Sequence, residues 1–280
     1  MKIYEKLSFD EERALYGQRD IIIKDCSFDG PADGESAMKE AGGIRAERCY
    51  FNLRYPFWHC DELDIVDSEM TELCRAALWY SNDINIRGSK LHGIKAVREC
   101  NRVKIENCDV ISPEFGWFSS DIEAKHSKFV SEYFMLRAKN LRFSDIDFKG
   151  KYSFQYIEDS VFENCNFDTK DAFWHAKNVT VRNSTVKGEY LAWYAENLTF
   201  ENCTIIGTQP LCYCKNLKLI NCKTVDCDLS FEKSAVDAEI VGHILSVKNP
   251  ESGRIVADSI GEIIYDTSAQ NCDIKVRSVL

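Results

Sequence analysis

Apolar and polar residues alternate in short segments along this chain. The clearest segment is residues 195–205, A-E-N-L-T-F-E-N-C-T-I. Apolar Leu198 and Phe200 are separated there by polar Thr199, and Asn202 follows. Alternation with a period of two, in segments rich in branched and aromatic residues, is typical of β-strands. Because asparagine tolerates the left-handed backbone conformation, we expect this strand to end in a turn at Asn202.

The same pattern recurs every nineteen residues. It is spelled K-N-V-T-V-R-N-S-T-V at residues 177–186 and K-N-L-K-L-I-N-C-K-T at residues 215–224. Apart from two longer steps of 23 and 21 residues near the start, the equivalent anchor positions are 19 residues apart: Ile21, Ile44, Leu63, Ile84, Val103, Ile122, Leu141, Ser160, Val179, Leu198, Leu217, Val236, Ile255 and Ile274. A fixed period of this size predicts a solenoid of about thirteen coils, each packed on its neighbours.

A column of small residues predicts a tight corner inside each coil. Five positions after the anchor, most coils have cysteine or serine: Cys26, Cys49, Ser68, Ser89, Cys108, Ser127, Cys165, Ser184, Cys203 and Cys222. Aspartate or asparagine commonly precedes them, as expected for a turn. We interpret the 13 cysteines mainly as small buried packing residues and not as disulfides. The cysteine-rich segment 212–227 fits no standard zinc site.

The segment before each anchor has aromatic residues at fixed positions. It reads F-W-H-C at residues 57–60, L-W-Y-S at residues 78–81 and G-W-F-S at residues 116–119. We expect these segments to be strands, with side chains alternating between the interior and the surface. The tryptophan side chains can point either into the interior or toward solvent. We favour tryptophans pointing inward beside small residues, because the opposite facing would bury charged residues such as Lys95 and Glu99.

Strand–corner–strand units with this period resemble the right-handed single-stranded parallel β-helix of the pectin-lyase-like superfamily. The likeness covers essentially the whole chain, and the phrases W-x-x-C/S and N-L-x-F-x-N-C resemble an uncharacterised bacterial family within that superfamily. The resemblance implies an all-β fold but no activity. The paired aspartates and G-H-G of polygalacturonase-like hydrolases are absent, so no catalytic residue is carried over. A pentapeptide-repeat helix is the alternative, although its four similar faces do not fit the aromatic segment.

The first residues differ from the repeats. Ser8 and Glu11 have the spacing of a capping box, and Gly17 suits the end of a helix. We therefore predict a short capping helix within residues 1–17 and a single β-helix domain over residues 18–280. A helix there would cover the open backbone of the first coil.

One flank of the predicted solenoid is dense in aromatic and charged side chains. Such a surface can stack on the apolar faces of sugar rings. We predict that it binds an oligo- or polysaccharide through these residues: His59, Tyr80, Phe118, Tyr133, Tyr152, Tyr156, Asp171, His175 and Tyr194. The alternative is a non-enzymatic scaffold whose flank docks a protein partner or a second copy, because exposed aromatic patches also mark protein contacts.

Four charged residues of this flank are candidate catalytic groups: Lys95, Glu99, Glu114 and Arg137. Lys95 and Glu114 occupy equivalent positions in adjacent coils and should lie close, because stacked strands are about 4.8 Å apart. The carboxylates of Glu99 and Glu114 should be about 14 Å apart, too far for a glycosidase pair. A lyase-like or glycoside-hydrolase-like activity is the enzymatic hypothesis, and a surface ladder of salt bridges is the interpretation that we favour.

Composition and charge argue against two classes of partner, nucleic acids and membranes. With 35 Lys and Arg against 45 Asp and Glu, the net charge is 35 − 45 = −10, which argues against nucleic-acid binding. No apolar run is long enough for a membrane span and no signal-peptide core follows the start, so we expect a cytoplasmic location. No phosphate-binding loop or metal-binding motif is present, and His59 and His175 are six coils apart, so we expect no cofactor and no metal.

Overall fold

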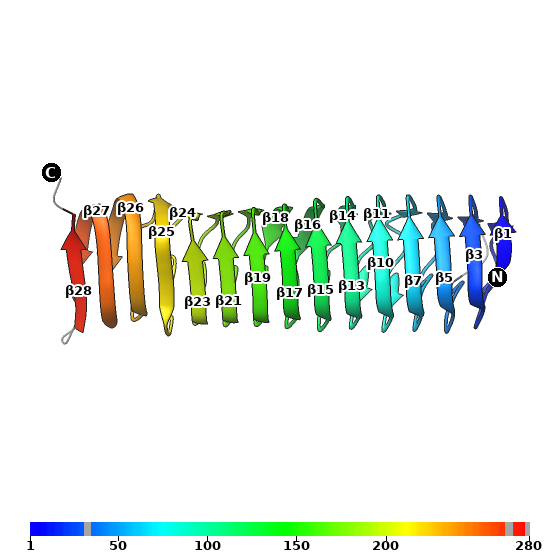
Figure 1. Cartoon of the computed structure of the whole chain (residues 1–280), viewed down its shortest axis with the longest axis horizontal. Helices are drawn as coiled ribbons and strands as arrows, with labels where there is room; N and C mark the ends of the chain where they lie inside the picture. The colour runs from blue at the N-terminus through cyan, green and yellow to red at the C-terminus, as the bar shows by residue number, and fades with distance from the viewer. Residues whose placement is uncertain (31–34, 267–270, 278–280) are drawn as a thin grey trace. The chain divides into compact units, whose positions relative to one another are not determined.

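The computed structural model describes residues 1–30, 35–266 and 271–277, and all its regular elements are β-strands (Figure 1). Contacts between residues divide the chain into two compact units, Met1–Asp147 (unit 1) and Phe148–Leu280 (unit 2). Within each unit the strands are parallel and stacked, so the predicted all-β parallel solenoid is confirmed. No described segment is a long apolar helix of the kind that spans a membrane. A single domain over residues 18–280 stays a prediction.

Unit 1 contains three sets of stacked strands. The first sheet consists of β1 (Lys2–Glu5), β3 (Arg19–Lys24), β5 (Gly42–Glu47), β7 (Asp61–Val66), β10 (Asn82–Arg87), β13 (Asn101–Glu106), β15 (Ser120–Lys125) and β17 (Lys139–Ser144). The second consists of β2 (Ser8–Phe9), β4 (Ser27–Phe28), β6 (Tyr50–Phe51), β8 (Glu69–Met70), β11 (Lys90–Leu91), β14 (Asp109–Ile111) and β16 (Lys128–Glu132). The third is the short pair β9 (Leu78–Trp79) and β12 (Val97–Arg98).

Unit 2 continues the same type of coil. Its first sheet consists of β19 (Glu158–Glu163), β21 (Lys177–Arg182), β23 (Glu196–Glu201), β25 (Leu217–Val225), β26 (Ala235–Lys248), β27 (Ser252–Ile264) and β28 (Asn271–Val276). Its second sheet consists of β20 (Asn166–Asp168), β22 (Thr185–Lys187), β24 (Thr204–Ile206) and the end of β25. The strand β18 (Asp147–Lys151) contains the boundary between the units.

The strand register confirms the nineteen-residue period. Val179 lies opposite Leu198 in unit 2, and Ile84 lies opposite Val103 in unit 1. Residues at equal offsets in the repeat are therefore neighbours along the stack. The anchors Ile84, Val103, Val179 and Leu198 are all buried, so the apolar positions of the repeat form the core.

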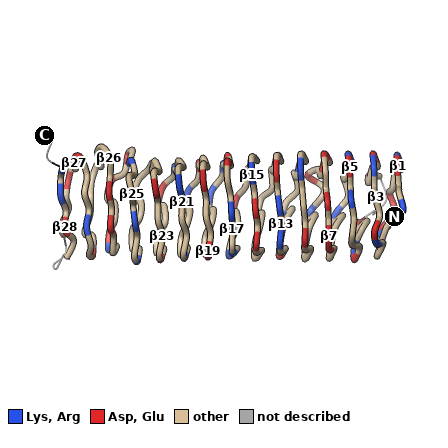
Figure 2. The backbone as a smooth tube through the Cα atoms, viewed as in Figure 1, with Lys and Arg blue, Asp and Glu red and all other residues tan. Residues whose placement is uncertain are grey.

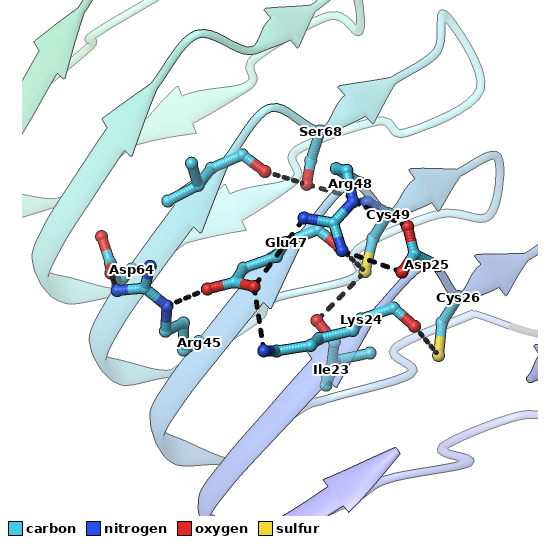
Figure 3. Close-up of polar contacts among 11 residues, drawn as sticks. Ile23, Lys24, Asp25, Cys26, Arg45, Glu47, Arg48, Cys49, Asp64 and Ser68 are labelled. Carbon is cyan, nitrogen blue, oxygen red and sulfur yellow. Dashed lines mark hydrogen bonds and ion pairs between the residues drawn. The ribbon is translucent and has the colours of Figure 1, made fainter. Parts of the chain in front are cut away.

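The cysteine column lies at a buried inner corner, as predicted. Of the 13 cysteines, 12 are buried and none forms a disulfide. Figure 3 shows one corner, where Sγ of Cys49 donates to the carbonyl of Ile23 at 3.5 Å. The backbone N–H of Cys49 donates to Oγ of Ser68 in the next coil at 3.0 Å. Asn202, which precedes Cys203, has φ of 53°, the left-handed conformation expected at this corner.

The predicted N-terminal helix is wrong. Residues 1–17 form the first coil instead, because β1 pairs with β3 and β2 pairs with β4. The N–H groups of Arg13, Leu15 and Gly17 donate to carbonyls 22 residues ahead and not to carbonyls of a preceding helical turn. Leu15 is buried in the position of a core residue. Pairing with the next coil thus outweighs the local helix signal, whose capping contribution is only about 1 kcal/mol.

The tryptophan-bearing segments are mainly turns, so the expected inward tryptophan column is wrong. In L-W-Y-S, Leu78 and Ser81 are buried, whereas Trp79 is half-buried and Tyr80 is 40% exposed. Tyr80 has φ of 55°, and a left-handed residue interrupts the alternation of sides that a strand would show. Both central side chains of the segment therefore lie at the surface.

Candidate functional site

All the candidate residues lie in the turns that precede the strands of the first sheets. We call these turns the flank. In unit 1 the flank comprises residues 55–59, 76–80, 95–99, 114–118 and 133–137. In unit 2 it comprises residues 152–156, 171–175, 190–194 and 209–213. The left-handed residues of these turns direct pairs of adjacent side chains outward, which gives the flank its density of aromatic rings.

In the flank of unit 1, the structure brings Lys95 and Glu114 together as the sequence predicts. Nζ of Lys95 lies 3.1 Å from Oε2 of Glu114, and both side chains are about three-quarters buried. The N–H of Glu114 donates to the carbonyl of Glu132 in the next coil, which holds the turn in place. The pair is therefore a fixed, partly desolvated ion pair.

Glu99 is the centre of a second polar group. Nε of Arg98 donates to Oε1 of Glu99 at 3.2 Å. The hydrogen bond between Tyr80 and Glu99, together with burial, raises the pKa of the Tyr80 hydroxyl. The N–H of Glu99 donates to the carbonyl of Trp117 at 2.8 Å. Arg98 and Tyr80 are thus the polar neighbours of the Glu99 carboxylate.

Arg98 is a functional candidate that the sequence analysis missed. Its guanidinium lies 5.3 Å from the ring centroid of Trp117 and 5.9 Å from that of Phe118, within cation–π range. Phe118 is 47% exposed. The signal was present in the sequence, because Arg98 in V-R-E-C occupies the position that other repeats give to tryptophan.

The other predicted residues of this flank are more peripheral. His59 is exposed, and its Nδ1 lies 3.3 Å from a carboxylate oxygen of Glu40. Tyr133 is exposed and makes an edge contact with Trp117 at 6.1 Å. Arg137 is exposed two coils beyond Glu99, in the same position of the repeat.

A small cavity lies in the same flank. It has a volume of about 220 Å³ and is lined by Tyr55, Arg75, Ala76, Trp79, Lys95 and Arg98. Of these only Lys95 was predicted as a site residue. Arg75 is exposed and has no ion pair with any described residue.

Trp58 and Trp79, whose rings stack with centroids 5.7 Å apart, differ from the other three tryptophans of the flank. Trp117, Trp174 and Trp193 each donate their indole N–H to the carbonyl sixteen residues ahead. Trp79 instead stacks on Tyr80, with ring centroids 5.1 Å apart and an interplanar angle of 17°. Its Nε1 is buried and has no hydrogen-bond partner among the described residues.

The flank of unit 2 is a ladder of stacked rings. The centroids of Tyr156 and His175 are 4.7 Å apart, those of His175 and Tyr194 are 5.0 Å apart, and those of Tyr194 and Tyr213 are 4.8 Å apart. The interplanar angles are only 8°, 9° and 13°. The rings therefore cover each other's faces and present mainly their edges to solvent, which leaves little face for a sugar ring.

The remaining predicted residues of unit 2 lie in the same turns. Asp171 is buried, and burial is the main reason that the pKa of its carboxyl is raised. Burial also lowers the pKa of His175, and the charge of Lys177 adds to this effect. Tyr152 is half-buried, with Nζ of Lys151 at 5.6 Å from its ring centroid. These shifts favour the neutral form of both Asp171 and His175.

The outer face of the first sheet of unit 1 has a larger but self-paired depression. Its volume is about 630 Å³, and it is lined by Asp83, Asn85, Arg102, Lys104, Asp121, Ile122, Glu123, Asn140 and Arg142. Arg102 binds both carboxylate oxygens of Asp83, at 2.6 and 2.7 Å. Charges of both signs alternate from coil to coil (Figure 2). Similar pairs of opposite charge, such as Arg48 with Asp25, appear in Figure 3. This face is a ladder of ion pairs.

No group of three or more His, Cys, Asp or Glu side chains within residues 1–30, 35–266 and 271–277 is arranged to hold a metal ion.

Comparison with known proteins places the chain in a family. Residues 2–277 match the family model described as "Protein of unknown function (DUF3737)". The chain belongs to this family. No curated protein matches it.

Several solved structures are similar to this DUF3737 protein at low identity. The periplasmic alginate epimerase AlgG shares 8% identity over 98% of this chain and 78% of its own, with a TM-score of 0.42. The pentapeptide-repeat protein HetL from the cyanobacterium Nostoc sp. shares 7% identity over 84% of this chain and 86% of its own, with a TM-score of 0.30. The catalytic domain of a GH87 α-1,3-glucanase shares 10% identity over 100% of this chain and 61% of its own, with a TM-score of 0.23. None of these likenesses bears on what the chain does.

Proposed function

We propose that this protein binds a carbohydrate on the flank of unit 1. The observation that carries the proposal is the cavity beside Trp79, which has aromatic walls, convergent cationic groups and the exposed ring of Tyr80 next to it. Sites for small ligands typically combine aromatic walls with a few polar groups that fix the orientation. Phe118 extends the same aromatic column two coils further, about 10 Å away at the ordinary strand spacing.

The two flanks differ in what they offer a sugar. A sugar ring needs an aromatic face, and in unit 2 most faces are covered by neighbouring rings. In unit 1, Phe118 meets Trp117 in an edge-to-face contact with an interplanar angle of 87°, so no parallel ring stacks on Phe118 in that pair. The sugar-binding role of Tyr156, His175 and Tyr194 is therefore the weaker part of the proposal, and that of Phe118 is the stronger. Tyr80 lies between the two, because one of its faces stacks on Trp79.

Binding is better supported than catalysis. The carboxylates of Glu99 and Glu114 already have cationic partners, Arg98 and Lys95. We therefore assign these groups to positioning and recognition.

The experiment is a binding survey with purified full-length protein. A panel of neutral and acidic oligosaccharides would be titrated by calorimetry, and the best ligand would then be tested with Tyr80→Ala and Phe118→Ala. Loss of one stacking ring should raise Kd roughly tenfold, equivalent to about 1.4 kcal/mol. The matched control is Tyr50→Ala, which removes an exposed ring on β6, away from the flank. Absence of binding across the panel, or equal affinity of all variants, would refute the proposal.

Exposure of Tyr80, Phe118 and Tyr133 also supports the second candidate function, a protein-docking surface. Sedimentation velocity distinguishes the two. Self-association that Phe118→Ala abolishes, without any oligosaccharide binding, would favour a docking surface for a second copy.

A further inference from the structure

We propose that a second copy of this chain docks on the outer face of the second sheet of unit 1, with two-fold symmetry. This surface lies outside the flank, so the inference does not depend on carbohydrate binding there. Its centre is formed by Ile111 in β14 and Val130 in β16, which are neighbours in the strand register. Their side chains are 42% and 46% exposed. Adjacent aliphatic side chains on the solvent side of a sheet are typical of a contact surface.

The equivalent positions of the preceding coils are polar. Asn52 and Thr71 occupy two of them, and Oγ1 of Thr71 donates to Oδ1 of Asn52. His92 follows, and its Nε2 lies 2.9 Å from a carboxylate oxygen of Asp109. Stacking of the coils therefore does not require an apolar residue at this position. The apolar character is local to β14 and β16, as expected where a partner is bound.

The charges of β16 make a second copy the matching partner. With five residues, β16 is the longest described strand of the second sheet of unit 1. Its exposed side chains are those of Lys128, Val130 and Glu132, and the two residues between them, Phe129 and Ser131, are buried. Along the strand, the outer face thus presents a cation, an aliphatic side chain and an anion.

Two such faces are complementary when their strands run in opposite directions. A two-fold axis along the stack of coils, between two copies placed face to face, produces this arrangement. Lys128 of one copy then lies opposite Glu132 of the other, on both sides of a pair of Val130 side chains. Ile111 meets Ile111 one coil away, at the ordinary spacing of about 4.8 Å. The result is an apolar centre with an ion pair on each side, as is usual in protein interfaces.

The alternative two-fold arrangement is disfavoured. An axis along the strands would keep the strand direction and place Lys128 opposite Lys128, and like charges that face each other oppose binding. In the arrangement that we propose, the backbones of the two sheets are about 10 Å apart, which leaves room for the side chains of both faces.

The proposed dimer should be weak. Its apolar centre consists of only two aliphatic side chains from each copy, far fewer residues than the roughly 20–30 that each partner contributes to a standard interface. Each copy also has a net charge of −10, and this repulsion is strongest at low ionic strength. Association should therefore be measured at a physiological ionic strength of about 0.15 M.

Sedimentation equilibrium of the full chain tests for the dimer. We expect reversible dimerisation that is detectable at protein concentrations up to about 0.5 mM. Val130→Asp puts a charge at the centre of the contact and should raise the Kd of dimerisation at least about tenfold. The matched control is Ile220→Asp, which changes an exposed aliphatic residue on β25 in unit 2 and should leave the Kd unchanged.

A charge swap tests the geometry of the contact. Lys128→Glu alone brings carboxylates face to face and should raise the Kd about tenfold. Lys128→Glu together with Glu132→Lys exchanges the two charges and restores the attraction across the axis. The Kd should then return to within about threefold of that of the unaltered protein. A dimer that Lys128→Glu weakens and the exchange does not restore would overturn the proposed arrangement.

Two further results would overturn the inference. One is a chain that remains monomeric up to about 0.5 mM. The other is a dimer that Phe118→Ala abolishes and Val130→Asp leaves intact, which would assign self-association to the flank. Carbohydrate binding is measured separately by calorimetry, so failure of the dimer and failure of the proposed function are distinguishable.

Discussion

At the scale of single residues, the corner cysteines explain why so many thiols are tolerated. Each is small enough for the tight inner corner, and its Sγ donates to backbone carbonyls, as Cys203 does to Val181 and Glu201, each at 3.3 Å. Serine serves at the same position, where Oγ of Ser184 accepts from the N–H of Cys165 at 2.9 Å. The column therefore needs a small side chain with a weakly polar end, and not a reactive thiol.

Burial of four further cysteines, which lie outside the corner column, predicts a stability that falls at alkaline pH. Burial raises the pKa of Cys60, Cys212, Cys214 and Cys227 from 9.0 to about 12. Well below pH 9 both folded and unfolded chains keep the proton, so this contribution to stability is fully present. Above it the unfolded chain loses protons first, and each such thiol removes on the order of 1 kcal/mol by pH 10. Urea unfolding midpoints should thus fall steadily from pH 8 to 10.

The matched variant for this prediction is Cys214→Ser, which removes one titrating group from a repeat position that is serine in other coils, at Ser81 and Ser119. Its unfolding midpoint should depend less steeply on pH than that of the unaltered protein. Midpoints that stay constant up to pH 10 would show that the thiols do not control the alkaline limit.

At the scale of elements, the flank shows what a sequence pattern can and cannot predict. The spacing of nineteen residues correctly placed Lys95 beside Glu114, because strand stacking alone converts sequence offset into position. The direction of the tryptophan side chains was predicted wrongly, because Tyr80 and its equivalents adopt positive φ. Only glycine and asparagine indicate positive φ in a sequence, so a tyrosine at such a position gives no warning. The cavity was missed for a related reason, since it depends on how the Trp79 indole is turned.

The stacked ladder of unit 2 should be a structural element. His175 lies between Tyr156 and Tyr194, and each stacked pair is worth about 0.5–1.5 kcal/mol. His175→Ala should therefore lower the free energy of unfolding by about 1–3 kcal/mol. His175→Phe keeps a ring in the stack and should retain most of this stability. Neither change should alter the affinity for an oligosaccharide bound to unit 1. Loss of that affinity in His175→Ala, with stability unchanged, would instead assign the ladder to ligand binding.

At the scale of the whole molecule, residues that recur at fixed offsets in the repeat account for most of the fold. The anchors, the corner column and the turn-forming asparagines each recur at a fixed offset, so one coil specifies the next. The N-terminal helix was predicted from a local capping pattern, and pairing with the second coil overrides it. Charge at this scale is also repetitive, and most exposed ion pairs join neighbouring coils, as between Arg45 and Asp64 at 2.6 Å. The cavity beside Trp79 lies where the repeat is interrupted, because Arg75, Ala76 and Trp79 belong to the 21-residue step between Leu63 and Ile84.

Repetition of this kind predicts that one coil of unit 2 can be removed whole. Deletion of residues 179–197 joins Asn178 to Leu198 and recreates the Asn197–Leu198 junction, so every later side chain keeps its offset. Because stability in a solenoid is nearly a sum of coil and interface terms, the shortened protein should fold with the same β-sheet circular dichroism per residue and somewhat lower stability. Deletion of residues 179–188 is the control, since it shifts the repeat by ten residues and puts Glu189 at the buried position of Val179. Cooperative unfolding of both variants alike would mean that the nineteen-residue coil is not the unit that carries the fold.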